Sequence, residues 1–591
     1  MSFRTPSIRN SLRLTDAKRS AVALVAIVAV GGALRLYQIG EESVWLDETF
    51  TIDDATAHSP LELLLQPDGK AFFMLVFKGW TELFGTSATA IRLPSAIFGI
   101  ASIVALYLLG TRLYDRRVGL LSASIIALSP YHIYYAQEAR RYSLFVLLAV
   151  LSFYFLVGMA DRGRRGRVVG YLLTTILLTH THMFSVFVLL AQNLYVFTVS
   201  SLGRRPNRSV PIRTWIGLQA IVGVLMLPWL VPNLLQLVPV GGGGGATDGG
   251  QVFLPWLDPP SLGYIVRLPA IYVSGYTGYG LAMFVILPFF VVLIAISAIG
   301  VSGFRLADTG EESTGSSKTS TGSNNVSTGT GEGSTGSDEV PASDGGSESA
   351  EPSARPNGVG GDAARPYRDP TGETEQSFVS LVQLAIRHRR EAYLLAIWVN
   401  VMVFVPFVLS FLLTPMFVGR YTITASAGLF VLIAAGIRNL EFRSIWLLVF
   451  ALLVVVALLV PLPGYYATDQ KEQWGDATDR IEADAGGDDL IVLSPDYNTE
   501  NPFFYHYEGD ETTVIGVNGS VTDEQIEAAV EEHEDVWLLF SHVIVEEGHR
   551  ERVLDITNET HELVDHGEYG GAATHGGLEL YHYTPETNAS D

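Results

Sequence analysis

The sequence predicts a polytopic α-helical membrane protein that ends in a small, acidic α/β domain. Apolar residues make up 48% of the 591 residues, and they gather in blocks of about 20, the length that crosses a bilayer at about 1.5 Å rise per residue. The net charge of −23 is unevenly placed. From Tyr465 onward there are 31 acidic and 4 basic residues, whereas the first 464 residues hold 30 acidic and 34 basic ones. In that acidic tail, short apolar strands alternate with helical patterns.

The chain begins with a basic segment, residues 1–19, which the positive-inside rule assigns to the cytoplasm. The first span follows at 20–40, and we interpret it as a retained anchor because no small-residue cleavage pattern follows it. Residues 41–87 are then an outer loop, with short surface helices at 61–66 and 72–85. If the second helix crossed the membrane, the most basic loops would all move outside. These loops are 112–117, 161–167 and 203–208.

Further spans are expected in a membrane module that covers residues 20–302. They lie at roughly 90–110, 118–135, 142–160, 168–183, 184–202, 214–236 and 279–301. A second outer loop, 237–278, opens with five glycines and is expected to be a mobile flap. The Gly/Ser/Thr/Asp/Glu-rich segment 303–388 cannot bury enough apolar surface to fold, so we expect a disordered cytoplasmic linker.

Three more spans in the segment 389–464 complete a prediction of about eleven, and they place residues 465–591 outside the cell. These spans lie at about 391–413, 421–437 and 444–464. The tail has expected strands at 489–495, 513–517, 536–542 and 578–583 and expected helices at 522–532 and 545–555. Its acidity, with few lysines, resembles that of haloarchaeal proteins and excludes nucleic acid as a partner. The absence of cysteine excludes disulfides, thiolate metal sites and a cysteine nucleophile.

The stretch 45-WLDETFTIDD-54 places four carboxylates just outside the first span. Trp45 is expected to anchor the membrane edge. A carboxylate near hydrocarbon loses hydration, so a cluster there indicates a function. We interpret Asp47 as a general base with Glu48 as its acidic neighbour. The alternative is that both are solvated loop residues or a helix cap.

Other polar residues are expected at the same outer side of the membrane, where basic side chains run against the positive-inside trend. They are Lys70, Arg92, Glu138, Arg140, Arg141, His180, His182, Arg420 and Tyr421. If the spans form a bundle, these side chains converge on one outward-facing cavity, and its cations suit a phosphate at the headgroup level. Taken singly, each is also explained as a surface, headgroup-binding or packed polar residue. The two histidines are two residues apart and would point in different directions on a helix, which argues against a metal site from this pair.

The chemistry that fits is transfer of a sugar from a polyprenyl phosphate. The phosphate needs Arg or Lys, and the acceptor hydroxyl needs one base. Because the phosphate is a good leaving group, a single displacement is sufficient, and that route inverts the anomeric centre. This differs from the two spaced carboxylates of glycoside hydrolases.

Several stretches resemble one known family in the expected order. They are 45-WLDET-49, 67-PDGKAFFMLVFKGWTELFG-85, 89-TAIRLPSAIFGIASIVALYLLG-110, 128-LSPYHIYYAQEARRYSLFVLLAV-150 and 415-PMFVGRYTITASAGLFVLIAAGI-437. The family is the membrane glycosyltransferases of the type C fold, in particular the dolichyl-phosphate-mannose protein mannosyltransferases and the aminoarabinose transferases of lipid A. The resemblance implies that Asp47 is the catalytic carboxylate, that Lys70 and Arg92 face the donor phosphate, and that Tyr142 completes the Glu138 and Arg140 block.

The resemblance implies a polyprenyl-phosphate sugar donor, mannose or a similar hexose, with a glycan, lipid-linked or protein acceptor. No cofactor is certain, and a divalent cation at Asp47 and Glu48 stays open. Three alternatives remain: a transporter or flippase for lipid-linked sugars, which predicts inverted repeats, a receptor or scaffold built on the tail, and an oligosaccharyltransferase. For the last, the tail offers only 473-QWGD-476 near the membrane.

Overall fold

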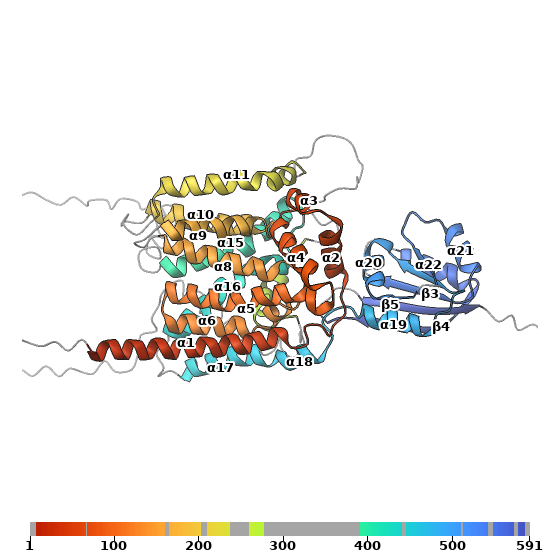
Figure 1. Cartoon of the computed structure of the whole chain (residues 1–591), viewed down its shortest axis with the longest axis horizontal. Helices are drawn as coiled ribbons and strands as arrows, with labels where there is room; N and C mark the ends of the chain where they lie inside the picture. Colours follow the sequence, from red (N-terminus) through yellow and green to blue (C-terminus); the bar gives the residue numbers. More distant parts are fainter. Residues whose placement is uncertain are drawn as a thin grey trace, which may run out of the picture. The chain divides into compact units, whose positions relative to one another are not determined.

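The computed structural model describes most of the chain outside the predicted linker (Figure 1). The described residues are 7–66, 68–159, 165–202, 210–236, 259–276, 390–439, 445–509, 512–541, 548–572 and 577–585. The glycine-rich first part of the predicted flap (237–258), the span at 279–301 and the linker at 303–388 lie outside these ranges.

Long apolar helices form the bundle in Figure 1, where α8, α9, α10 and α15 run side by side. The long helices are α1 (Ser7–Leu36), α5 (Ala88–Leu113), α6 (Arg116–Leu128), α8 (Tyr142–Gly158), α9 (Arg165–Thr179), α10 (Ser185–Leu202), α11 (Ile212–Gln236), α15 (Arg390–Leu412), α16 (Thr424–Asn439) and α17 (Ile445–Leu459). Within the described residues, four helical segments are long and apolar enough to cross a membrane: Asp16–Leu36, Ala88–Leu113, Ile212–Asn233 and Arg390–Leu412. These helices support the predicted class of polytopic helical membrane protein.

Small residues let the first helices of the bundle approach closely. A Cβ atom at Gly110 of α5 would lie 3.0 Å from the Cα atom of Gly119 of α6. A Cβ atom at Gly31 of α1 would lie 2.9 Å from the Cβ atom of Ala127. At the end of α1, the buried Arg35 donates to the carbonyl oxygens of Ile126 (2.8 Å) and Ala127 (3.0 Å), which have no partner inside α6. These contacts fix the point at which the chain leaves α1 for the acidic stretch.

Short helices follow or precede the long ones. They are α2 (Leu46–Ala57), α3 (Pro60–Leu65), α4 (Ala71–Phe84), α7 (Pro130–Tyr134), α12 (Leu262–Ser274), the 3₁₀ helix η2 (Gly419–Thr422) and α18 (Pro461–Ala467). Two of them carry predicted site residues: α2 carries Asp47 and Glu48, and η2 carries Arg420 and Tyr421. Helices α3 and α4 match the short helices predicted at 61–66 and 72–85. Ser59 and Glu62 form a capping box that starts α3. Helix α12 lies within the predicted loop 237–278, and its Tyr272 is buried with the hydroxyl group 2.6 Å from Thr422 Oγ1.

The C-terminal region is a five-stranded mixed sheet in the order β2-β1-β3-β5-β4. The strands are β1 (Leu490–Ser494), β2 (Thr513–Gly516), β3 (Val536–Ser541), β4 (His561–Gly570) and β5 (Gly577–Pro585), and the helices are α19 (Trp474–Asp484), α20 (Asp496–His506), α21 (Asp523–Glu531) and α22 (His549–Asn558). Strand β1 is parallel to β2 and β3, whereas β5 is antiparallel to β3 and β4. The four predicted strands agree with the structure. Edge strand β4 was not predicted, because its mostly exposed residues show no apolar alternation.

Both faces of the sheet are covered by helices. Alternate β1 residues point to opposite faces, so Leu490 and Val492 pack with α21 and α22, while Ile491 and Leu493 pack with α19 and α20. Trp45 belongs to the second of these cores and is only 6% exposed. The expectation that Trp45 anchors the membrane edge is therefore wrong: its side chain belongs to the buried cluster that also contains Trp474 and residues of the C-terminal sheet.

Candidate active site

Helix α2 begins directly after Trp45 and carries Asp47 and Glu48 in its first turn. Successive residues of an α-helix point about 100° apart, so adjacent carboxylates face different surroundings. The Glu48 side chain is fully buried, whereas that of Asp47 is 18% exposed. The two carboxylates accordingly belong to two separate clusters.

Glu48 lies in a closed cluster with Arg92 and Lys471, which we call the Glu48 cluster. Arg92 donates from Nε to Glu48 Oε1 (2.9 Å) and from Nη2 to Oε2 (2.6 Å), and Lys471 Nζ lies 3.2 Å from Oε1. The backbone N–H of Ala139 also donates to Oε1 (2.8 Å). Burial alone would raise the pKa of Glu48, but the charges of Arg92 and Lys471 and these hydrogen bonds lower it to about 2. A carboxylate stabilised in this way is a poor base.

Arg92 uses all five of its N–H groups inside the protein. Besides the two bonds to Glu48, Nη1 donates to the carbonyl oxygens of Ile39 (3.1 Å) and Glu42 (2.9 Å), and Nη2 donates to that of Ser43 (2.8 Å). The structure therefore does not support the predicted contact of Arg92 with a donor phosphate. The sequence places Arg92 at the correct end of its helix, but the side chain turns toward the loop 39–48.

Asp47 lies in a second cluster, which includes two of the predicted arginines. Arg140 Nη2 is 3.5 Å from Asp47 Oδ1, and Arg420 Nη1 is 3.3 Å from Oδ2. Arg140 Nη1 also donates to the Asp47 carbonyl oxygen (2.8 Å). The three residues come from α2, from the turn between α7 and α8, and from η2. The structure thus brings together three predicted residues that lie far apart in the sequence.

Around these arginines, several buried N–H and O–H groups have no hydrogen-bond acceptor among the described residues. They are Nε of Arg140, Arg141 and Arg420, the Tyr142 hydroxyl group and Nε2 of His182. A buried polar group without a partner costs about 1–3 kcal/mol, and such groups are rare in proteins. Several donors and three positive charges in one place indicate a site for an anion. We call these five residues the anion site.

His182 is packed among aromatic rings, and a backbone hydrogen bond determines which of its ring nitrogens carries the proton. His182 lies 5.9 Å from the Tyr142 ring and 5.1 Å from the Tyr421 ring, measured between centroids. Because the backbone N–H of Phe184 donates to His182 Nδ1 (3.1 Å), the proton of the neutral imidazole is on Nε2. Burial and the charges of Arg141, Arg140 and Arg420 lower the pKa of His182 well below its usual range. His182 is therefore a neutral donor, and the rings of Tyr142, His182 and Tyr421 lie close together.

Glu138 is a buried carboxyl group in the same turn as Arg140. The side chain is inaccessible, and neither carboxyl oxygen has a hydrogen-bond partner among the described residues. Burial and the negative charge of Asp47 raise the pKa of Glu138 to about 8, against the opposing charges of Arg140 and Arg420. At neutral pH most of this carboxyl group is protonated and uncharged.

The structure places two other predicted residues in different contacts. Lys70 precedes α4 and forms ion pairs with Asp54 (2.5 Å) and Asp68 (2.8 Å). Asp54 follows Asp47 by seven residues on α2, so the two lie on one helix face about 10 Å apart along the axis. His180 Nδ1 lies 2.9 Å from the carbonyl oxygen of Ile176 in its own helix. No hydrogen bond or ion pair within the described residues joins Lys70 or His180 to the anion site.

Two further features bear on the alternatives. The 473–476 stretch starts α19, where Trp474 is buried in the domain core and donates to Glu472 Oε2 (2.9 Å). Lys471, which sequence reasoning missed, is the only lysine after residue 464. A single lysine directly after the last span, in a region of net charge −27, is a signal that could have identified it.

Across the described ranges, no group of three or more His, Asp or Glu side chains is placed to hold a metal ion.

Fold and site together define a helical membrane protein with a buried cationic site beside a carboxylate. Residues 71–231, from α4 into α11, match the family model described as dolichyl-phosphate-mannose-protein mannosyltransferase. The matched segment contains Glu138, Arg140, Arg141, Tyr142 and His182. It confirms the predicted resemblance over that segment and supports the predicted enzyme class, a membrane glycosyltransferase with a lipid-linked sugar donor. No curated protein matches the sequence.

Solved structures of two kinds are similar to the chain. ArnT from Cupriavidus metallidurans bound to undecaprenyl phosphate is 11% identical at a TM-score of 0.46, with 94% of this chain and 97% of that chain covered. The Archaeoglobus fulgidus oligosaccharyltransferase in complex with Zn and sulfate is 10% identical at a TM-score of 0.44, with coverage of 95% and 73%. AglB from the same organism, in complex with an inhibitory peptide and a dolichol-phosphate, is 12% identical at a TM-score of 0.39, with coverage of 98% and 75%.

Proposed function

We propose that the protein is an inverting glycosyltransferase of the type C fold. It transfers mannose or a similar hexose from a dolichyl or other polyprenyl phosphate to a hydroxyl group of a glycan, lipid or protein. The observation that carries this proposal is the pairing of the Asp47 carboxylate with two arginines of the anion site, whose further donors are buried without acceptors. The family description of residues 71–231, which names a dolichyl-phosphate-mannose donor, supports the same donor class.

In this proposal the anion site binds the donor phosphate. Arg140, Arg141 and Arg420 supply positive charge, and the Tyr142 hydroxyl and His182 Nε2 supply neutral donors. As the sugar leaves, negative charge grows on the phosphate oxygens. Fixed donors in a water-poor site stabilise that developing charge more than they stabilise the bound donor, which is the condition for catalysis.

Asp47 acts as the general base for the acceptor. The acceptor oxygen forms a bond to the anomeric carbon while the bond from that carbon to the phosphate oxygen breaks, and the phosphate leaves with the electron pair. The hydroxyl proton passes to the Asp47 carboxylate. Since Arg140 and Arg420 belong both to the anion site and to the pairs with Asp47, they hold the base beside the leaving group. One displacement inverts the anomeric configuration.

The two ends of α16 support a site on the outer face of the membrane. Arg420 precedes α16, whereas Arg438 in its last turn pairs with Asp115 (2.9 Å) in the basic 112–117 loop. A helix of 16 residues is about 24 Å long, so the site and this loop lie on opposite sides of the bundle. If the basic loop is cytoplasmic, the anion site and the C-terminal domain are outside, as the topology of eleven spans predicts. A haloarchaeal cell would provide such an exterior with a high salt concentration, which suits the acidic tail.

The test is a panel of polyprenyl-phosphate sugars presented to the purified protein in liposomes. Mass spectrometry follows modified lipid, glycan and peptide acceptors, and NMR gives the configuration of the new bond. We expect release of polyprenyl phosphate and an inverted product from at least one donor. A retained configuration would contradict the displacement. Translocation of the lipid-linked sugar without transfer would favour a flippase, and transfer of an oligosaccharide to asparagine would favour an oligosaccharyltransferase.

A further inference from the structure

Lys471 joins the C-terminal domain to the candidate active site. It lies in the short segment between α18 and α19 and is only 2% exposed. Its Nζ atom donates to Glu48 Oε1 (3.2 Å) and to the carbonyl oxygen of Gln137 (2.9 Å). One partner is the neighbour of Asp47 on α2, and the other begins the turn that carries Glu138 and Arg140. Lys471 therefore contacts two of the three segments that bring charged groups together at this site, α2 and the turn before α8.

The bonds around Lys471 form a continuous chain into the Asp47 pair. Glu48 Oε1 accepts from Lys471 and also from the backbone N–H of Ala139 (2.8 Å). Ala139 lies between Glu138 and Arg140, and Arg140 is the residue that pairs with Asp47. Lys471 and Glu48 thus fix the turn from two sides. A shift of about 1 Å in a catalytic constellation is enough to reduce rates about 100-fold.

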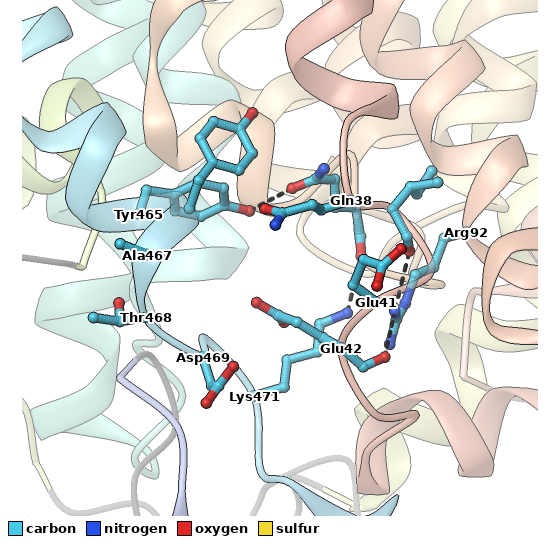
Figure 2. A pocket seen from close by; sticks show the side chains of 12 residues that line it. Gln38, Glu41, Glu42, Arg92, Tyr465, Ala467, Thr468, Asp469 and Lys471 are labelled. Atoms are coloured by element: carbon cyan, nitrogen blue, oxygen red, sulfur yellow. Dashed lines mark hydrogen bonds between the residues drawn. The ribbon is translucent and has the colours of Figure 1, made fainter.

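Neighbouring residues hold the 465–472 segment in place along one wall of a polar cavity of about 130 Å³ (Figure 2). Tyr465 donates to Gln137 Oε1 (2.7 Å), and the backbone N–H of Gln470 donates to Glu42 (3.0 Å). In Figure 2, the side chains of Lys471 and Glu42 lie next to each other at this cavity. The charged groups that face Lys471 are Arg92, Glu48, Glu42 and Glu138. Burial and the charge of Arg92 lower the pKa of Lys471, and the carboxyl groups, Glu48 first, oppose that shift by favouring the charged ammonium group.

We propose that Lys471 is a positioning residue for the transfer reaction, and that the C-terminal domain completes the active site through it. The proposal rests on the function proposed above. Through Glu48 and Gln137, Lys471 sets the distance between Asp47 and Arg140, while the donor phosphate is bound by other residues. The C-terminal domain is then part of the active site. Its buried core also contains Trp45, which lies two residues before Asp47.

The experiment compares full-length Lys471→Met and Lys471→Arg proteins with the wild type in the same transfer assay. The matched control is Arg480→Met, which removes an exposed cation from the same domain. We expect Lys471→Met to lower kcat about 10- to 100-fold with a much smaller change in the donor KM. Lys471→Arg should recover most of the rate, and the control should be near wild type. If Lys471→Met does not fold, Lys471→Gln, which keeps a donor and loses the charge, replaces it.

A pH profile separates positioning from mere attachment of the domain. Loss of the lysine charge removes one of the groups that lower the pKa of Glu48, so in Lys471→Met the acid limb of kcat/KM should lie at higher pH than in the wild type. A folded Lys471→Met or Lys471→Gln protein with wild-type kcat and an unmoved acid limb would overturn the role of Lys471 alone. Absence of transfer by the wild-type protein from every donor would overturn the proposed function, and this inference with it.

Discussion

The two adjacent carboxylates of α2 differ in how completely the protein satisfies their partners. In the Glu48 cluster, every N–H group of Arg92 has an acceptor, and Glu48 accepts four hydrogen bonds or ion-pair contacts. Beside Asp47, the arginines keep Nε groups without acceptors, and the nearby Tyr142 hydroxyl and His182 Nε2 have none among the described residues. A closed network stabilises a fold, whereas an open set of buried donors fits a ligand.

This difference separates two arginines that look equivalent in the sequence. Arg92 lies near the start of an apolar helix and Arg420 directly before one, and each pairs with a carboxylate of α2. Arg92 has no donor left for a substrate, but Arg420 has. The comparison predicts that substitutions in the Glu48 cluster impair folding, whereas substitutions in the anion site impair substrate binding.

The largest effect is expected for Arg92→Met. This change leaves Glu48 buried with Lys471 as its only remaining cation, and breaking a buried ion pair costs about 3–5 kcal/mol. We expect a large fall in the thermal unfolding midpoint in detergent and a low yield of folded protein. If Arg92→Met instead folds with wild-type stability and loses only donor binding, Arg92 contacts the donor phosphate, and its structural role is contradicted.

Arg420→Met should show the opposite behaviour. Loss of a charged donor to a phosphate corresponds to about 1.5–3 kcal/mol, so binding of polyprenyl phosphate should weaken by about 10- to 100-fold. The unfolding midpoint should change little, because Arg420 is partly exposed. The matched control is Arg438→Met at the other end of α16, which breaks only an exposed ion pair. Equal donor affinity in the two variants would contradict the placement of the phosphate.

Glu138 predicts a pH dependence on the alkaline side. Its raised pKa, about 8, means that the carboxyl group is mostly neutral at pH 7 and gains a negative charge as the pH rises through 8. That charge lies beside Asp47 and opposes a bound phosphate, so the donor KM should rise between pH 7 and 9. Glu138→Gln, which stays neutral, should flatten this limb. A limb that persists unchanged in Glu138→Gln must come from another group.

The smallest effect is expected for His182→Phe, which keeps the ring and removes the Nε2 donor. One neutral hydrogen bond contributes about 0.5–1.5 kcal/mol, so donor affinity should fall about 2- to 10-fold. Because the pKa of His182 lies well below its usual range, the ratio of wild-type to variant affinity should stay constant from pH 6 to 8. A ratio that increases toward acid pH would show that the ring titrates.

Much of the fold follows from local pattern, and the site follows only in part. Apolar blocks predict the long helices, and the 138–142 stretch brings Glu138, Arg140, Arg141 and Tyr142 together in one turn. These local patterns do not encode the direction of a side chain. The sequence therefore predicts a phosphate contact for Arg92 and Lys70, whereas the structure pairs them with Glu48 and Asp54. Trp45 shares a buried cluster with Trp474, and Lys471 donates to Glu48, and in both cases the residues are more than 400 positions apart in the sequence. No local periodicity reports such contacts.

The most direct test of the account separates donor binding from transfer in Asp47→Asn. A general base contributes about 10²- to 10⁴-fold, so transfer should fall by that factor. Binding of polyprenyl phosphate should be kept or strengthened, because a negative charge beside the anion site is removed. Asp53→Asn, the same change six residues further along α2, serves as the control and should transfer normally. Full transfer by Asp47→Asn, or loss of donor binding together with transfer, would contradict the assignment of Asp47 as the base beside a phosphate site.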